Sequence, residues 1–152
     1  MLLNPDCIGQ RSEPRSIVIE AGQLKLFAKA IGETNPIYFD EAAAKAAGHK
    51  NILVPPTFGS CLKFLAPAQS PSADELGLDY KALLHAEETI EYHAPLYVGD
   101  RVTLVTEVDS IYTKKDGALE FLVRTTHITD EAGNLLQSVT NTVVMKNAGA
   151  TA

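Results

Sequence analysis

The chain has 152 residues, of which 45% are hydrophobic and 21% charged, values that are ordinary for one globular domain with a single core. Its net charge of −6 argues against a nucleic-acid partner, because phosphate binding needs a concentrated basic face. No apolar run approaches the ~20 residues that span a bilayer, so we expect no membrane partner either.

The first predicted element is an amphipathic helix over residues 20–31. Glycine at position 32 would stop it, as glycine commonly does just past a helix end. The apolar residues that recur at helical spacing are Leu24, Phe27, Ala28 and Ile31.

A loop, GETNPIYFD at 32–40, leads to a second predicted helix. Asn35 precedes a proline and is therefore biased toward an extended backbone. Asp40 precedes EAAAKAA, a run of strong helix formers that ends at a glycine, so Asp40 is the expected N-cap. These residue types are well explained by a connector, although Glu33 and Tyr38 also bring acid-base groups into the loop.

A third helix is expected over residues 57–65, followed by a stop at Pro67. Its apolar stripe consists of Phe58, Cys61, Leu62 and Leu65, widened by Phe64 and Ala66, so we expect it to be largely buried. The polar stretch that follows, AQSPSADELGLDYK, is predicted to cross the surface with about one helical turn.

The remainder of the chain is predicted to form an antiparallel sheet. Four segments rich in Val, Ile, Thr and Tyr are separated by the turn signals VGD, KKDG and DEAGN. They are LLHAEETIEYHAPLYVGD (83–100), RVTLVTEVDSIYTK (101–114), ALEFLVRTTHITD (118–130) and NLLQSVTNTVVMK (134–146). A strand of a dozen residues runs ~40 Å, too long for a flat layer in so small a domain, so the sheet must curl around the buried helix. The expected fold class is therefore α+β.

We expect one domain over residues 1–147 and a disordered tail over 148–152. The opening MLLNPDCIGQ lacks the pattern of a signal peptide, which favours a cytoplasmic protein.

Cys7 and Cys61 lie far apart without metal-binding spacing, so both should be free thiols. His85 and His93 would share one face of a strand, but no further ligand completes a metal site, and we expect none.

The residues from 21 to 58, AGQLKLFAKAIGETNPIYFDEAAAKAAGHKNILVPPTF, resemble the start of MaoC-like acyl-CoA hydratases and dehydratases. LLHAEETIEYHAPLYVGDRV is similar to the next strand pair in the type I fatty-acid-synthase-like branch of that superfamily, which also favours PPTF. The resemblance covers nearly the whole chain. It implies the hot-dog fold, a curved antiparallel sheet wrapped around a central buried helix.

The resemblance also assigns catalytic positions, and this sequence departs from the family at three of them. Active members carry an aspartate and a histidine that hold the reacting water, where this chain has Glu33 and Tyr38. The glycine whose N–H usually stabilises the enolate aligns with Pro56, which has no N–H, so the donor would be Thr57. Tyrosine is a poor proton acceptor at neutral pH, because its unperturbed pKa is about 10.

Asn35 and Asp40 match the family pattern and are expected to fix the loop, Asp40 as a cap. The resemblance further assigns contact with substrate to Asn35, Pro56, Phe58 and His85.

The implied activity is reversible addition of water to a trans-2-enoyl thioester, carried by CoA or an acyl-carrier protein, without a metal or redox cofactor. If the chain is competent alone, Glu33 is the base, Tyr38 positions water and the Thr57 amide polarises the carbonyl. The alternative is a non-catalytic subunit that binds the acyl thioester beside a catalytic hot-dog partner. A thioesterase is a third reading, opposed by the absence of a carboxylate in residues 57–65.

An edge strand and an apolar rim predict a homodimer or heterodimer.

Overall fold

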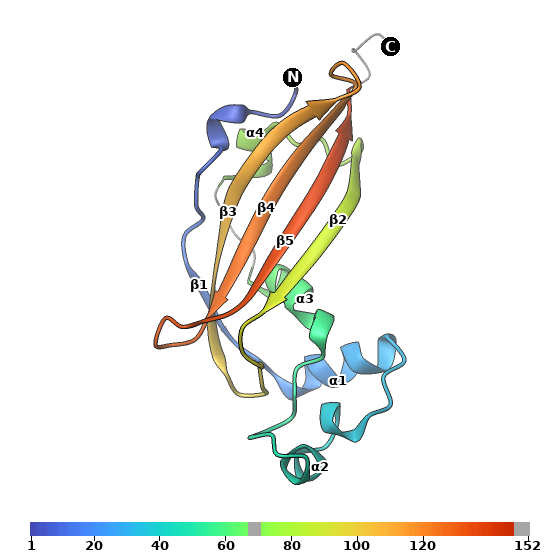
Figure 1. Ribbon diagram of the computed structural model, residues 1–152, viewed down its shortest axis with the longest axis vertical. Coiled ribbons are helices and arrows are strands. Elements are labelled where there is room, and N and C mark those ends of the chain that lie inside the picture. Colours follow the sequence, from blue (N-terminus) through green and yellow to red (C-terminus); the bar gives the residue numbers. More distant parts are fainter. Residues whose placement is uncertain (67–70, 148–152) are drawn as a thin grey trace.

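The computed structural model describes residues 1–66 and 71–147. Five strands form one antiparallel sheet in the order β1-β3-β4-β5-β2, and the sheet curves over the helix α3 (Figure 1). The strands are β1 (Arg15–Val18), β2 (Leu83–Tyr92), β3 (Arg101–Lys114), β4 (Leu119–Thr129) and β5 (Leu135–Lys146). The expected α+β fold with a curled sheet is confirmed, whereas the predicted tail and the stop at Pro67 lie outside the described residues.

The four long strands lie in the four predicted segments, but two details differ from the sequence prediction. β2 ends at Tyr92, and residues 93–100 form a loop in which the amides of His93 and Ala94 both bond to the carbonyl of Leu136. The short β1, which pairs with β3, was not predicted. The termini of the described chain both lie at the end of the sheet farthest from α1 and α2 (Figure 1).

The two predicted N-terminal helices are confirmed as α1 (Ala21–Ala30) and α2 (Glu41–Ala46). Asp40 caps α2 as expected, because its Oδ1 accepts a 2.7 Å hydrogen bond from the amide of Ala43. On α1, Leu24 and Ala28 are buried, while Ile31 just beyond its end is exposed.

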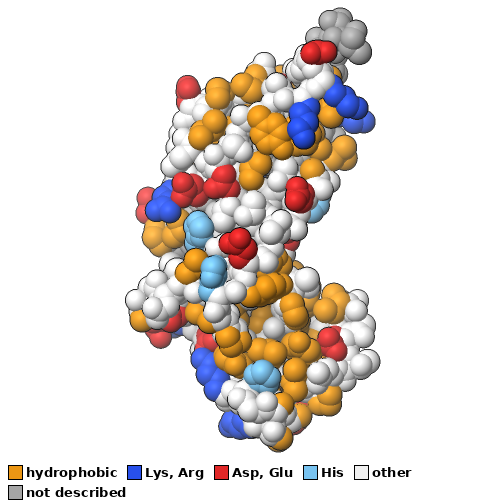
Figure 2. Space-filling model, in the orientation of Figure 1, with side chains coloured by type: hydrophobic (Ala, Val, Ile, Leu, Met, Phe, Trp, Pro, Cys, Tyr) orange, Lys and Arg blue, Asp and Glu red, His pale blue; other side chains and the backbone are white. Residues whose placement is uncertain are grey.

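The central helix begins as a 3₁₀ turn, η3 (Pro56–Phe58), and continues as α3 (Gly59–Leu65). Leu62 is completely buried, but Phe64 is 75% exposed, so the prediction that it widens the buried stripe was wrong. α3 presents only one face to the concave sheet, and Phe64 lies on the other. Figure 2 shows hydrophobic side chains gathered over the helical end of the molecule.

Two apolar clusters fill the concave side of the sheet. The first joins α3 to the sheet and contains Phe58, Leu62, Leu104, Ile128 and Val139 among others. The second lies at the other end of the strands, under η1 (Pro5–Cys7) and α4 (Ala73–Leu76), and includes Leu3, Leu76, Leu122 and Met145. The predicted surface crossing thus has its single helical turn, but Leu76 within it is a core residue.

A polar row separates the two clusters. Arg124, Asn141 and Glu88 are neighbours across β4, β5 and β2 in the pairing register. Asn141 Nδ2 donates to Glu88 Oε2 at 3.1 Å, and Lys63 Nζ of α3 donates to the same oxygen at 3.0 Å. The sheet therefore has polar character midway along its inner face.

The N-terminal segment is held by a buried carboxylate. Glu120 on β4 is fully buried, and its Oε2 accepts hydrogen bonds from the amides of Leu2 and Leu3 at 2.7 and 2.9 Å. Asn147 Nδ2 donates to Glu120 Oε1 at 3.0 Å. Because the carboxylate of Glu120 is shielded from water and these bonds satisfy it, residues 2–3 are fixed against the second cluster. Within residues 1–66 and 71–147, no helix has the length and apolar character needed to cross a membrane.

Candidate functional site

The loop at 32–40 uses the carboxylate of Glu33 within itself. Glu33 Oε1 accepts hydrogen bonds from the amides of Thr34 and Asn35, both at 2.8 Å. These amides follow Glu33 directly in the chain, so the side chain folds back over its own backbone. One oxygen of the proposed base is therefore committed to holding the loop.

The negative charge of Glu33 acts on the phenol of Tyr38. Partial burial raises the pKa of Tyr38 above its ordinary value, and the negative charge of Glu33 raises it further. The phenol therefore keeps its proton at neutral pH and can donate a hydrogen bond, but it is a poor proton acceptor.

The remaining loop residues form caps and a tether. Asn35 Oδ1 accepts from the amide of Ile37 at 3.2 Å and caps the 3₁₀ turn η2 (Pro36–Tyr38). The carbonyl of Ile37 accepts from the amide of Leu53 at 3.2 Å, which ties the loop to the segment that leads into η3. Asn35 and Asp40 thus have the structural roles that the sequence predicted. The contact between Asn35 and substrate stays a prediction.

At the start of η3, Pro56 has no backbone N–H to donate, whereas Thr57 has one. Pro56 has no N–H, and its carbonyl accepts a 2.9 Å hydrogen bond from Tyr92 Oη at the end of β2. Thr57 is exposed and lies in the first helical turn, where an N–H has no intrahelical acceptor. Phe58 is buried and makes an edge contact with Phe27 at 5.2 Å between ring centroids, so it serves the core.

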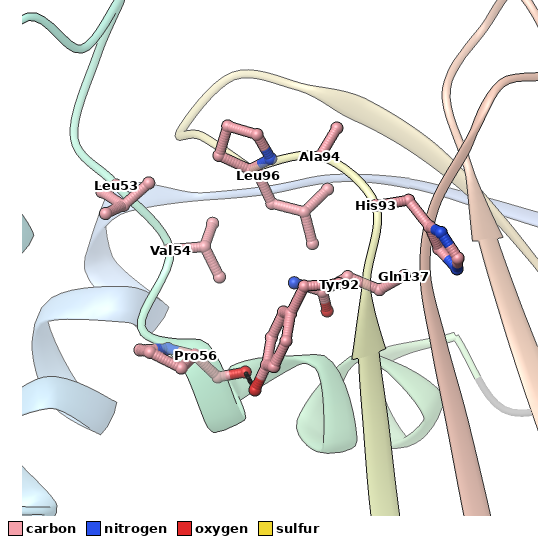
Figure 3. A pocket seen from close by; sticks show the side chains of 9 residues that line it. Leu53, Val54, Pro56, Tyr92, His93, Ala94, Leu96 and Gln137 are labelled. Atoms are coloured by element: carbon pink, nitrogen blue, oxygen red, sulfur yellow. Dashed lines mark hydrogen bonds between the residues drawn. The ribbon is translucent and has the colours of Figure 1, made fainter.

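A pocket of about 380 Å³ lies beside this helix start (Figure 3). Its wall is mainly apolar and comes from the segment before η3, the loop after β2 and one residue of β5. The lining residues are Leu53, Val54, Pro56, Tyr92, His93, Ala94, Pro95, Leu96 and Gln137. Of the residues predicted to catalyse the reaction or contact substrate, only Pro56 lines it.

His85 lies apart from this pocket. It is exposed near the start of β2, seven residues or roughly 23 Å of strand from Tyr92. A register shift between His85 and Glu87, together with the end of β2 at Tyr92, removes the regular alternation that would place His85 and His93 on one face. Among the described residues, no group of three or more His, Cys, Asp or Glu side chains is arranged to hold a metal ion.

The carboxylate nearest to α3 comes from β2. Partial burial raises the pKa of Glu88, but hydrogen bonds from Ser60, Lys63 and Asn141 outweigh this effect, so its pKa is lowered. Glu88 is therefore a stabilised anion and a poor base. Cys61 beside it is half-buried against the first cluster, and burial, with the charge of Glu88, raises the pKa of its thiol. This agrees with a packing role for Cys61.

Gln137 of β5 was not identified from the sequence. It is 4% exposed, it lines the pocket, and its Oε1 has no hydrogen-bond partner among the described residues. Figure 3 shows its side chain reaching from β5 into the pocket, while that of His93 points away. A Cβ atom at Gly59 would collide with this Oε1, so α3 approaches the amide closely.

The curved antiparallel sheet around the central helix α3 defines the hot-dog fold. Residues 6–139 match the family described as "FAS1-like, dehydratase domain region". The chain is 36% identical over 135 residues to the UPF0336 protein SCO4636 of Streptomyces coelicolor, covering 88% of each chain. It belongs to this FAS1-like dehydratase-region family.

Solved structures agree on the fold. A chain of the C-terminally truncated HadBC (3R-hydroxyacyl-ACP dehydratase) complex of Mycobacterium tuberculosis is 20% identical, with a TM-score of 0.78 and coverage of 93% of this chain and 99% of that one. A MaoC-like dehydratase is 24% identical, with a TM-score of 0.76 and coverage of 93% of this chain and 43% of the other. The predicted hot-dog fold is confirmed.

Proposed function

We propose that this chain is the acyl-binding subunit of a heteromeric 3-hydroxyacyl thioester dehydratase, equally a trans-2-enoyl thioester hydratase. A second hot-dog subunit supplies the aspartate and histidine that act on water. The substrate is carried by CoA or by an acyl-carrier protein, and the reaction belongs to fatty acyl metabolism in the cytoplasm. This chain contributes apolar surface for the acyl group.

The hydrogen bonding of Glu33 and the protonation of Tyr38 in the loop at 32–40 carry this proposal. Glu33 uses one carboxylate oxygen to hold the amides of Thr34 and Asn35, and Tyr38 remains protonated at neutral pH. Water addition needs a group that accepts a proton near neutral pH. A loop whose carboxylate supports its own backbone is better suited to shaping a site than to running the reaction.

The edge strand β2 supports a partner. Among the described strands it pairs with β5 alone, so the backbone groups on its other side are available to a second chain. The neighbour of similar fold from Mycobacterium tuberculosis is a chain of a complex, HadBC. We extend that arrangement to this chain as part of the proposal, with a homodimer as the other possible assembly.

A hydratase that works alone is the second candidate. Burial is the larger cause of the raised pKa of Tyr38, and the negative charge of Glu33 adds to it, so the two side chains interact. Thr57 retains an N–H in the first turn of η3. In this version Glu33 is the base, Tyr38 orients water, and the Thr57 amide polarises the thioester carbonyl.

Loss of enoyl absorbance separates the two candidates. Crotonyl-CoA and a longer enoyl-CoA are offered to the pure chain, and then to the tagged chain isolated with its partner from its natural host. We expect no turnover from the chain alone and turnover from the complex, with little change in the complex when Glu33→Ala is introduced. Turnover by the chain alone that disappears in Glu33→Ala would establish the second candidate. Release of free CoA would indicate a thioesterase.

A further inference from the structure

Gln137 is an unusual group for the wall of an apolar pocket. The residue is 4% exposed, and Oε1 accepts no hydrogen bond from any described residue. Buried polar groups in folded proteins nearly always have a partner, so an exception calls for a specific cause. The pocket beside it suggests that the missing partner belongs to a ligand.

The surroundings offer no replacement from the chain itself. On the neighbouring strands, Gln137 is paired with Tyr92 of β2 and Ile128 of β4. The hydroxyl of Tyr92 already donates to the carbonyl of Pro56, and Ile128 is apolar. Gly59 of α3 approaches Oε1 without a side chain. Among the described residues, none of these three neighbours donates a hydrogen bond to Oε1.

The chemistry of the pocket defines what would fill it. Leu53, Val54, Ala94 and Leu96 present apolar surface, and Gln137 adds a hydrogen-bonding group at the inner end of that surface. The terminal torsion of a glutamine is broad, so the amide can turn its oxygen toward the cavity. The complementary ligand has an apolar chain with one hydrogen-bond donor on it.

We propose that Gln137 is a specificity residue that recognises the hydroxyl group of a hydroxyacyl chain in this pocket, with Oε1 accepting the hydrogen bond. The inference rests on the proposed function and narrows it. The chain would bind the hydroxylated acyl thioester in preference to the same thioester without a hydroxyl. A site with a buried polar group discriminates in this way because the unhydroxylated ligand leaves that group without a partner.

Calorimetric binding tests the proposal with two probes of equal chain length, 3-hydroxyhexanoyl-CoA and hexanoyl-CoA. The natural chain without its catalytic partner, which would dehydrate the hydroxylated probe, should bind that probe about tenfold more tightly than hexanoyl-CoA. In Gln137→Met, which keeps the side-chain length but removes the amide, we expect the two affinities to become equal and the melting temperature to rise. Gln137→Leu provides a second apolar variant.

The control is Gln23→Met, the same substitution at an exposed position on α1, which should leave the preference unchanged. Equal affinities of the natural chain for both probes would overturn the role of Gln137 while leaving an acyl-binding subunit in place. Binding of neither probe, with or without the partner, would overturn the proposed function as well. A preference that survives in Gln137→Met would assign the recognition to another group.

Discussion

Glu120 and Gln137 lie on neighbouring strands, and both are almost fully buried, but their hydrogen bonding is opposite. Glu120, at the end of the sheet near the N-terminus, accepts from the amides of Leu2 and Leu3 and from the side chain of Asn147. Gln137, at the end near α3, has an oxygen without a partner. The difference separates a polar group whose partners are built into the chain from one whose partner must come from outside.

The largest effect should come from removing the carboxylate of Glu120, whose hydrogen-bond partners belong to the chain itself. Glu120→Ala removes the acceptor from two backbone amides, and each buried donor without a partner costs roughly 1–3 kcal/mol. We expect the free energy of unfolding, measured by urea denaturation, to fall by about 3 kcal/mol. Glu131→Ala is the control, because the side chain of Glu131 is 74% exposed and its contact with Arg101 is of a kind worth at most about 1 kcal/mol. A loss below about 1 kcal/mol in Glu120→Ala would show that the segment is held mainly by apolar packing.

A smaller effect should come from adding a methyl group beside Gln137 Oε1, which has no partner among the described residues. In Gly59→Ala the new methyl group meets Gln137 Oε1, and because this atom is the far end of a flexible side chain that can move aside, the overpacking should cost only about 1 kcal/mol. Gly22→Ala on α1 is the matched control, since its methyl group meets nothing and should stabilise the helix by about 0.5–1 kcal/mol.

The combination of Gly59→Ala with Gln137→Ala sharpens this prediction. Shortening residue 137 removes the colliding atom, so the cost of the methyl group should be mostly relieved and the two changes should not add. Additive losses in denaturation would mean that α3 meets a different obstacle, and the close approach of helix and amide would lose its support.

The smallest effect concerns the loop at 32–40. There Glu33, like Glu120, accepts hydrogen bonds from backbone amides. Burial and the charge of Glu33 raise the pKa of Tyr38 above 10, so the stabilisation from its neutral form is present below about pH 10 and is lost as pH rises through the raised value. The ultraviolet difference titration between the natural chain and Tyr38→Phe should isolate this late-titrating phenol. Glu33→Gln should lower its pKa only partly, because burial is the larger cause. An ordinary Tyr38 pKa in the natural chain would place the two groups apart.

The parts of the fold that depend on local sequence were predicted well. Asp40 before an alanine-rich run specifies its own cap, and the turn signals between Val-, Ile- and Thr-rich segments separate the long strands. β1 was missed because RSIV is too short to show a pattern and owes its structure to pairing with β3. Phe64 was placed wrongly because helical spacing alone does not say how wide a face the sheet will cover.

The candidate site was predicted only in part, for a related physical reason. Glu33 and Tyr38 both lie within the recognisable loop at 32–40, so their proximity followed from the motif. Gln137 lies in LLQSVTN, an ordinary strand sequence, and its importance depends on where α3 crosses β5. The nearest sequence signal was Gly59, a glycine inside a predicted helix, which marks a close approach without naming the residue on the other side.

The hydrogen bonds that Glu120 accepts from the amides of Leu2 and Leu3 also set an order of events during synthesis. Leu2 and Glu120 are 118 positions apart, and a ribosome adds roughly 5–20 residues per second. Leu2 is therefore made roughly 6–24 s before its acceptor exists. The segment that contains Leu2 and Leu3 consequently reaches its final place only after β4 has been made.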